Sequence, residues 1–347
     1  MAIVRIGQFT DIHDAPGFGK TKAIAEFLNS GKVDIGYLGG DFVQAGRYIK
    51  ILQEKMQKQD LAGLNKDDQQ LFQVYAQMQG FLAENSLEEI KEQLAQIDKK
   101  NDDLKGIEQM VKFYEQNQKK INDNKKKYDS LIEQSQKGVK EMMQTAESDL
   151  KTIDQIISGV TIPLLGVAGN HDPGFIYQLM PHIKWAEKGI QVVKGIRFAG
   201  APNLTQYDCA VQQQTGYYEG MEFEAPADPS KLEALVKQHG KEKVYAEISP
   251  SYKRLKDEKF DILLAHKGFE EGASDGKQQY PFSIPLLELV KKNKAVTLNG
   301  HIHGPNGFKC GKEYRGIRSS DQIFFVVGYD DQKKRVEYLD KYRWKTV

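Results

Sequence analysis

The sequence predicts an α/β domain, formed by residues 1–41 and 159–347, that is interrupted by a helical coiled-coil insertion over residues 42–158. In the α/β segments, short apolar runs typical of buried strands end in glycine and polar residues. The insertion has no proline and few glycines, and its apolar residues recur at steps of three and four. A chain of 347 residues is long enough to contain both parts.

Composition and charge exclude several classes of protein. The formal net charge is +1, so no global field attracts nucleic acid or an anionic membrane. The two cysteines, Cys209 and Cys310, suggest neither a disulfide framework nor a zinc-binding spacing. The N-terminus lacks the basic and apolar regions of a signal peptide. The longest apolar run is about ten residues, whereas a membrane span needs about 20. We therefore expect a cytoplasmic protein without a membrane association.

An Asp-x-His motif, Asp11-Ile12-His13, follows the first expected strand at residues 1–9. Side chains alternate along an extended chain, so residues two apart point to the same side. An oxygen donor and an imidazole placed in this way suit a divalent metal ion. On its own this motif is a weak signal.

The next segment, D-A-P-G-F-G-K-T at residues 14–21, differs from a phosphate-binding P-loop by one residue. The P-loop requires glycine where Asp14 stands, because its backbone amides cradle the phosphate. The proline removes another amide. We therefore expect a loop that caps a helix at residues 21–29, although its place beside Asp11 would still allow contact with a substrate.

Later expected strands end in the same polar way as the first. The expected strands, each with the residues that follow it, are 33–38 with Gly39-Gly40-Asp41, 160–168 with Gly169-Asn170-His171-Asp172, 260–265 with His266, and 295–299 with Gly300-His301-Ile302-His303. Open α/β sheets place their sites at the carboxyl ends of strands, so we expect these residues to converge. Five of the chain's seven histidines belong to this set, which packing alone does not readily explain. The other two, His182 and His239, are expected at the surface.

The insertion is expected to form an antiparallel helical hairpin. Its apolar residues form a heptad-like seam from Leu87 onward. The turn residues at 101–106 predict the tip, followed by a helix at about 107–157, roughly 75 Å long. Capping boxes at Asn65 with Asp68 and at Ser86 with Glu89 predict earlier helix starts. Its charges nearly balance, so a solvated face is favoured over a nucleic-acid arm, and the seam could bind a protein partner or a second copy.

The complete set of strand-end motifs resembles the calcineurin-like metallophosphoesterases. The motifs that carry this resemblance are D-I-H at 11–13, G-G-D at 39–41, G-N-H-D at 169–172, His266 and G-H-I-H at 300–303. The resemblance covers residues 1–41 and about 159–340. It implies a four-layer αββα sandwich, into which the helical hairpin is inserted, and a dinuclear metal centre at the edge of the sheets.

The resemblance also implies a role for each motif residue. One ion would be held by Asp11, His13, Asp41 and His303, and the other by Asp41, Asn170, His266 and His301. Oxygen and imidazole donors favour Mn over copper, with Fe or Zn as alternatives. The implied activity is that of a phosphoric ester hydrolase, most of all on phosphodiesters, in which a hydroxide activated by both ions attacks phosphorus. The catalytic residue His171 would contact the phosphate without ligating metal.

Two other functions remain open on the sequence. The first is a Mn-dependent DNA nuclease of the double-strand-break-repair type, which the absence of a strongly basic surface does not favour. The second is a coiled-coil partner-binding protein with a vestigial metal site, which the full set of expected ligands does not favour. A Ser/Thr protein phosphatase is disfavoured, because those relatives carry an aspartate where this chain has Gln44. The sequence does not identify the substrate.

Overall fold

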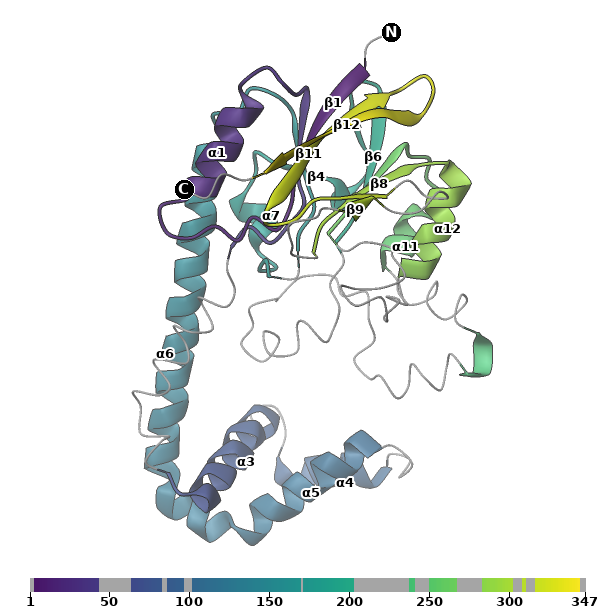
Figure 1. Cartoon of the computed structure of the whole chain (residues 1–347). Helices are drawn as coiled ribbons and strands as arrows, with labels where there is room; N and C mark the ends of the chain where they lie inside the picture. Colours follow the sequence, from purple (N-terminus) through teal and green to yellow (C-terminus); the bar gives the residue numbers. More distant parts are fainter. Residues whose placement is uncertain are drawn as a thin grey trace. The chain divides into compact units, whose positions relative to one another are not determined.

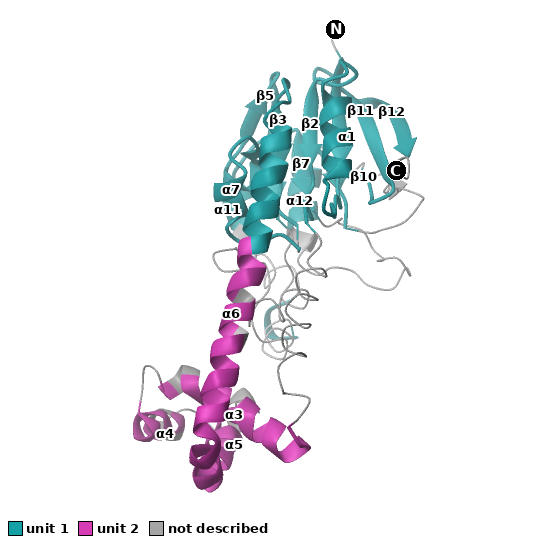
Figure 2. Ribbon diagram, turned by 90° about the vertical axis from the view of Figure 1, so that its left-hand side faces the viewer, with its two compact units in different colours: residues 1–45, 145–347 teal, residues 46–144 magenta. Residues whose placement is uncertain are grey.

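The structure is a computed structural model, and it describes residues 3–43, 64–82, 86–96, 102–169, 171–202, 237–240, 250–266, 283–301, 308–309 and 316–343. The chain divides into two compact units. The first contains residues 1–45 and 145–347, and the second contains residues 46–144 (Figure 2).

Two six-stranded mixed sheets form the centre of the first unit (Figure 1). The order in the first sheet is β12 (Arg335–Arg343), β11 (Ile323–Asp330), β1 (Ile3–Phe9), β2 (Ile35–Leu38), β3 (Leu164–Gly166) and β4 (Lys184–Trp185). The strands β1 to β4 are parallel, whereas β11 pairs antiparallel with β1 and with β12. The apolar runs expected near residues 1–9, 33–38 and 160–168 are thus neighbours in one sheet, with β3 shorter than its run.

The second sheet repeats this organisation with different strands. Its order is β5 (Gln191–Val193), β6 (Ile196–Ala201), β7 (Ile262–Ala265), β8 (Val296–Asn299), β10 (Gly316–Arg318) and β9 (Phe308–Lys309). Strands β6, β7, β8 and β10 are parallel, and antiparallel strands lie at both edges. The carboxyl ends of β7 and β8 therefore lie at the same edge of this sheet.

The hydrophobic core lies between the two sheets. Alternate residues of β7 show why the central strands are apolar throughout: Ile262 and Leu264 join the core between the sheets. Leu263 and Ala265 face the other way and pack with helices α11 (Pro250–Leu255) and α12 (Ser283–Asn293). Parallel strands covered on both faces are expected to be continuously apolar. The fold is therefore α/β, with two mixed sheets flanked by helices.

Other helices cover the outer face of the first sheet. Helix α1 (Gly19–Leu28) and the C-terminal part of α6 (Gln118–Ile157) lie side by side there (Figure 2). Phe27 of α1 packs edge-on against Phe9 of β1 and Phe324 of β11, with ring centroids 5.9 and 5.0 Å apart. Short helices α7 (Ile176–Leu179) and η2 (Ala186–Lys188) also belong to this unit.

Side chains also join the two sheets by hydrogen bonds near their carboxyl ends. Gln8 of the first sheet donates from Nε2 to the carbonyls of Asn299 (2.8 Å) and Ile317 (3.0 Å) in the second sheet. The hydroxyl of Tyr37 donates to the carbonyl of Ala265 over 2.9 Å. All these groups are buried, so water does not compete with the bonds.

The second unit is a cluster of helices. Its helices are α3 (Lys66–Leu82), α4 (Leu87–Gln96), α5 (Asp102–Gln116) and the N-terminal part of α6. They share one core, in which Tyr128 of α6 packs against Phe72 and Tyr75 of α3 with centroids 5.7 and 5.6 Å apart. The expected capping box at Ser86 and Glu89 is confirmed, with reciprocal bonds of 2.6 and 3.2 Å.

The expected turn of the helical hairpin is wrong at residues 102–106, which belong to helix α5. The single helix expected at about 107–157 is also divided, because α5 ends at Gln116 and α6 begins at Gln118. Asp102 and Asp103 are favourable in the first turn of a helix, and a single glycine such as Gly106 is tolerated within one. No helix in the described parts of the chain combines the length and apolar character that a bilayer crossing requires.

Candidate metal centre

The described candidate ligands lie at the carboxyl ends of parallel strands from both sheets. Asp11 and His13 follow β1, Asp41 follows β2, His171 follows β3, His266 follows β7 and His301 follows β8. Residues up to 290 positions apart are brought together, since the amide of His301 donates to Asp11 Oδ2 over 2.8 Å. The expected convergence at strand ends therefore holds for the described residues.

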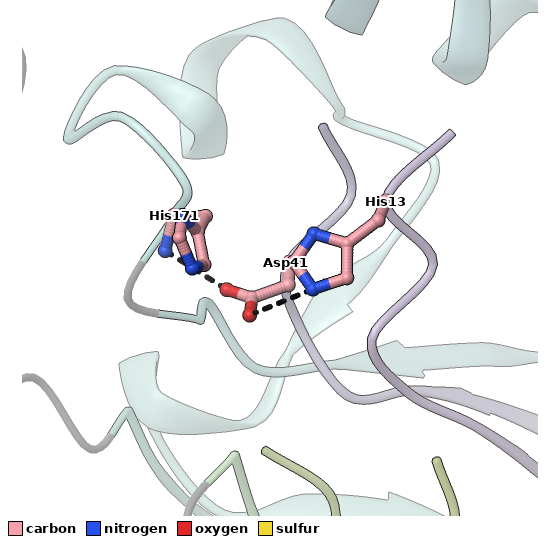
Figure 3. A group of neighbouring side chains, drawn as sticks. All are labelled: His13, Asp41 and His171. Atoms are coloured by element: carbon pink, nitrogen blue, oxygen red, sulfur yellow. Dashed lines mark hydrogen bonds and ion pairs between the residues drawn. The ribbon is translucent and has the colours of Figure 1, made fainter. Parts of the chain in front are cut away.

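Two groups of side chains have metal-ligating atoms within 4.8 Å of one another. His13, Asp41 and His171 form the first group (Figure 3). Asp41, His266 and His301 form the second. The Asp41 carboxylate is common to both groups, so it can be shared between two neighbouring sites.

The Asp41 carboxylate is almost completely buried among imidazoles. Its Oδ2 lies 3.5 Å from His13 Nε2 and 3.3 Å from His266 Nε2. Its Oδ1 accepts a 2.8 Å hydrogen bond from the backbone amide of His171 (Figure 3). Burial alone would raise the pKa of Asp41, but His266, His171 and His13 together hold that pKa well below its usual range. Asp41 is therefore a carboxylate, and its charge requires cationic neighbours.

His266 is oriented by its second ring nitrogen. Nδ1 lies 2.7 Å from the carbonyl of Gly39 and donates to it, which leaves Nε2 to face Asp41 and, at 3.3 Å, Nδ1 of His301. A backbone carbonyl that fixes the tautomer in this way is typical of a metal-ligating histidine. Burial would lower the pKa of His266, but Asp41 raises it to about 9.

Asp172 clamps two of the ligand-bearing loops together. Its carboxylate is fully buried and accepts three backbone amides, those of Gly169, Asp41 and Phe42, each over 2.8 Å. Burial and the charge of Asp41 raise the pKa of Asp172 to about 7. This residue joins the loop after β3 to the loop after β2, and it does not belong to either group of candidate ligands.

Four of the candidate ligands have a left-handed backbone conformation. The φ angles are 53° at Asp11, 42° at His13, 55° at Asp41 and 73° at His301. This conformation costs residues other than glycine on the order of 1–3 kcal/mol each and is concentrated at functional sites. The surrounding hydrogen bonds must therefore hold these residues in place, as the contacts of Asp172 and Asp11 show.

Glycine is required where the ligand loops approach one another. A Cβ at Gly169 would lie 2.2 Å from Asp41 Oδ1, and one at Gly300 would lie 2.5 Å from Asp11 Oδ2. No side chain could occupy either position without displacing a candidate ligand. The two glycines of the G-N-H-D and G-H-I-H motifs thus serve close packing around the site.

The candidate ligands named from the sequence differ in how far the structure describes them. His13, Asp41, His266 and His301 belong to the two groups of ligating atoms. Asp11 belongs to neither group among the described residues, but its Oδ2 accepts hydrogen bonds from the Thr10 hydroxyl and the His301 amide. Asn170 and His303 lie outside the described residues.

His171 lies beside His13 rather than apart from the ligand groups. The two rings are 5.2 Å apart in a T-shaped arrangement. The Nδ1 atom of His171 is buried and has no hydrogen-bond partner among the described residues. Gln44, the residue that the sequence distinguishes from the pattern of Ser/Thr protein phosphatases, lies outside the described residues.

The donor set fits divalent cations. It offers a carboxylate with a buried oxygen, Asp41 Oδ2, that accepts no hydrogen bond from the described part of the chain and is surrounded by imidazole nitrogens. Oxygen and imidazole donors suit Mn, Fe and Zn. Sequence reasoning did not assign roles to Asp172 or Thr10, because nothing in the local pattern indicates hydrogen bonds to segments so distant along the chain.

Comparisons with known proteins add little. No family model matches the sequence, and a search of curated proteins finds no match. One solved structure is 11% identical, with the alignment covering 99% of this chain and 100% of the other, at a TM-score of 0.47. The crystal structure of TT1561 of Thermus thermophilus is 10% identical over 99% of both chains, at a TM-score of 0.45. At these values neither structure identifies a function for this chain.

Proposed function

We propose that this protein is a metal-dependent phosphoesterase that hydrolyses phosphoric esters, with phosphodiesters as its main substrates. The observation that carries the proposal is the position of Asp41, whose buried carboxylate belongs to two adjacent groups of candidate ligands. A carboxylate shared by two cations is suited to phosphoryl transfer, in which paired ions stabilise the attacking and leaving oxygens. The strand-end motifs of the metallophosphoesterases point to the same activity.

The centre would hold two divalent ions, with Mn favoured and Fe or Zn as alternatives. His13 and Asp41 would contribute to one ion, and Asp41, His266 and His301 to the other. As the resemblance implies, Asp11 and His303 would complete the first set of ligands and Asn170 the second. Bound ions would supply Lewis-acid charge and lower the pKa of a water molecule. The protein's part is to hold its ligands in place before an ion arrives, through Asp172 and the Gly39 carbonyl.

His171 is proposed as the catalytic residue that contacts the substrate. Its backbone amide is fixed on Asp41, and its ring stands at the same edge as the candidate ligands. There it would donate a hydrogen bond to a phosphate oxygen or a proton to the leaving oxygen. In this role His171 affects turnover and leaves metal binding intact.

The second unit is proposed to bind a protein partner or a second copy of the chain. The part of its surface that is described carries both lysines and carboxylates, and Lys125, Lys126 and Lys127 of α6 are all exposed. A nucleic-acid substrate is not favoured, because the chain has almost no excess of positive charge.

The test compares wild type with His171→Ala and a control, His182→Ala, which alters an exposed histidine. Purified proteins are incubated with Mn²⁺ and bis-p-nitrophenyl phosphate, a phosphate monoester, or DNA, and bound metal is measured in parallel. We expect diester hydrolysis by wild type and the control, and loss of most activity with retained metal in His171→Ala. Equal turnover by His171→Ala would remove that residue from the mechanism, and preferred cleavage of DNA would favour the nuclease function.

A further inference from the structure

The loop of residues 14–21 is the sequence motif that the proposed function leaves unexplained. The structure shows that it is not a phosphate-binding loop, because the side chain of Asp14 occupies the start of helix α1. Asp14 Oδ2 accepts from the amide of Thr21 at 2.7 Å and from its hydroxyl at 2.6 Å. Asp14 thus caps the helix from seven residues away and closes the intervening residues into a loop.

This loop brings the side chain of Lys20 next to the Asp-x-His segment of the candidate metal centre. The ammonium group of Lys20 donates to the backbone carbonyl of Ile12 over 2.8 Å. Ile12 is the residue between Asp11 and His13, and its side chain is buried. The contact therefore reaches from the first turn of α1 to the centre of the Asp-x-His motif.

The motif needs such support because of its backbone. Asp11 and His13, on either side of Ile12, both have left-handed φ angles of 53° and 42°. Two strained residues in three relax unless several contacts oppose them. The amide of His13 is held by the carbonyl of Asp41 at 2.7 Å, and Asp11 is held by the amide of His301 at 2.8 Å. Lys20 supplies the corresponding contact at the middle residue.

We propose that Lys20 is a positioning residue of the metal centre, which holds the Ile12 carbonyl and so keeps Asp11 and His13 in the conformations that bring them to His301 and Asp41. The inference rests on the proposed function only in requiring that the centre bind a divalent ion. It does not require hydrolysis of any ester.

Lys20 is half-buried in acidic surroundings. Burial lowers the pKa of its ammonium group, and the carboxylates of Asp321, Asp14 and Asp11 oppose that change. A positive charge beside a cation site repels the cation, so its removal should strengthen metal binding if charge alone mattered. A positioning role predicts weaker metal binding when Lys20 is replaced, so the two effects can be separated by the direction of the change in affinity.

The experiment measures the dissociation constant for Mn²⁺ by titration calorimetry in the full chain. Lys20→Met removes the donor, Lys20→Arg retains a charged donor, and Lys22→Met alters an exposed lysine of the same helix as a control. We expect about tenfold weaker Mn²⁺ binding in Lys20→Met, which corresponds to the loss of one hydrogen bond from a charged donor. Lys20→Arg should recover most of the affinity, and Lys22→Met should match wild type.

Thermal unfolding of each variant controls for a general loss of stability. Unchanged or tighter Mn²⁺ binding by Lys20→Met would overturn the inference, as would equal weakening in Lys22→Met. If wild type bound no Mn²⁺, the metal centre itself would be refuted, and the role of Lys20 with it. Weakened binding in Lys20→Met by a protein that hydrolyses no ester would support the positioning role while refuting the proposed function.

Discussion

Glu187 provides a test of the structure in which no metal is needed. This glutamate lies in helix η2, is only 4% exposed, and accepts a 2.8 Å hydrogen bond from the amide of Ala168, just before the G-N-H-D motif. Burial raises its pKa to about 7, against 4.5 for an ordinary glutamate. The folded protein therefore holds a proton on Glu187 at pH values at which the unfolded chain has lost it.

The sign of the effect on stability follows from this difference. An acid whose pKa is raised by folding favours the folded state most at pH below 4.5, and its contribution falls as the pH rises to about 7. The whole difference is worth about 3 kcal/mol, of which about 2.5 kcal/mol is lost between roughly pH 5 and pH 8. Glu187→Gln is uncharged throughout, so it removes this dependence.

The assay is urea unfolding followed by tryptophan fluorescence at several pH values, since Trp185 is buried two residues from Glu187. The free energy of unfolding of Glu187→Gln minus that of wild type should rise by about 2.5 kcal/mol from about pH 5 to about pH 8. All other titrating groups are common to both proteins, so they cancel. Glu26→Gln, on the exposed side of α1, serves as the control. Parallel pH curves for Glu187→Gln and wild type would refute the reasoning.

Further substitutions test the contacts around the site and in the helical unit. Gly169→Ala places a methyl group 2.2 Å from Asp41 Oδ1, so we expect a loss of about 3 kcal/mol in urea unfolding and of Mn²⁺ binding by calorimetry. Asp172→Asn places an amide donor against backbone amides, so we expect the free energy of unfolding to fall by about 2–3 kcal/mol and Mn²⁺ binding to weaken. A variant that is as stable as wild type and binds Mn²⁺ equally well would contradict the role of Asp172 in joining the two loops. Tyr128→Ala removes a buried ring from the core of the helical unit. We expect the free energy of unfolding of that unit, followed by the circular dichroism of its helices, to fall by about 4 kcal/mol. An unchanged free energy would exclude the shared core.

The position of the site could be predicted because it depends on short-range patterns. Each apolar run becomes a strand whose next residues lie at its carboxyl end, and parallel strands bring these ends to one edge. His13, Asp41, His266 and His301 could therefore be named from the sequence, and they belong to the two ligand groups. The description of Asn170 and His303 as ligands stays a prediction.

The contacts that hold the site depend on long-range geometry that no local pattern reveals. Asp172 reaches the amide of Asp41 across 131 positions, and its role could not be separated from that of the neighbouring His171. The left-handed backbone of Asp11 and His13 is equally hidden, because an extended strand was the natural expectation there. The sequence does not indicate the helix boundary at Asn117, because one asparagine is a weaker turn signal than the composition of 101–106.

The hydrogen bonds of Gln8 and Tyr37 between the sheets have a consequence for ion selectivity. Asp41 comes from one sheet, whereas His266 and His301 come from the other, so the distance between the sheets would set the spacing of these candidate ligands around a bound ion. Gln8 and Tyr37 fasten the sheets at Asn299 and Ala265, two residues before His301 and one before His266. The packing between the two sheets would thus determine the size of ion that fits, and repacking it could change the preferred cation while every ligand stays the same.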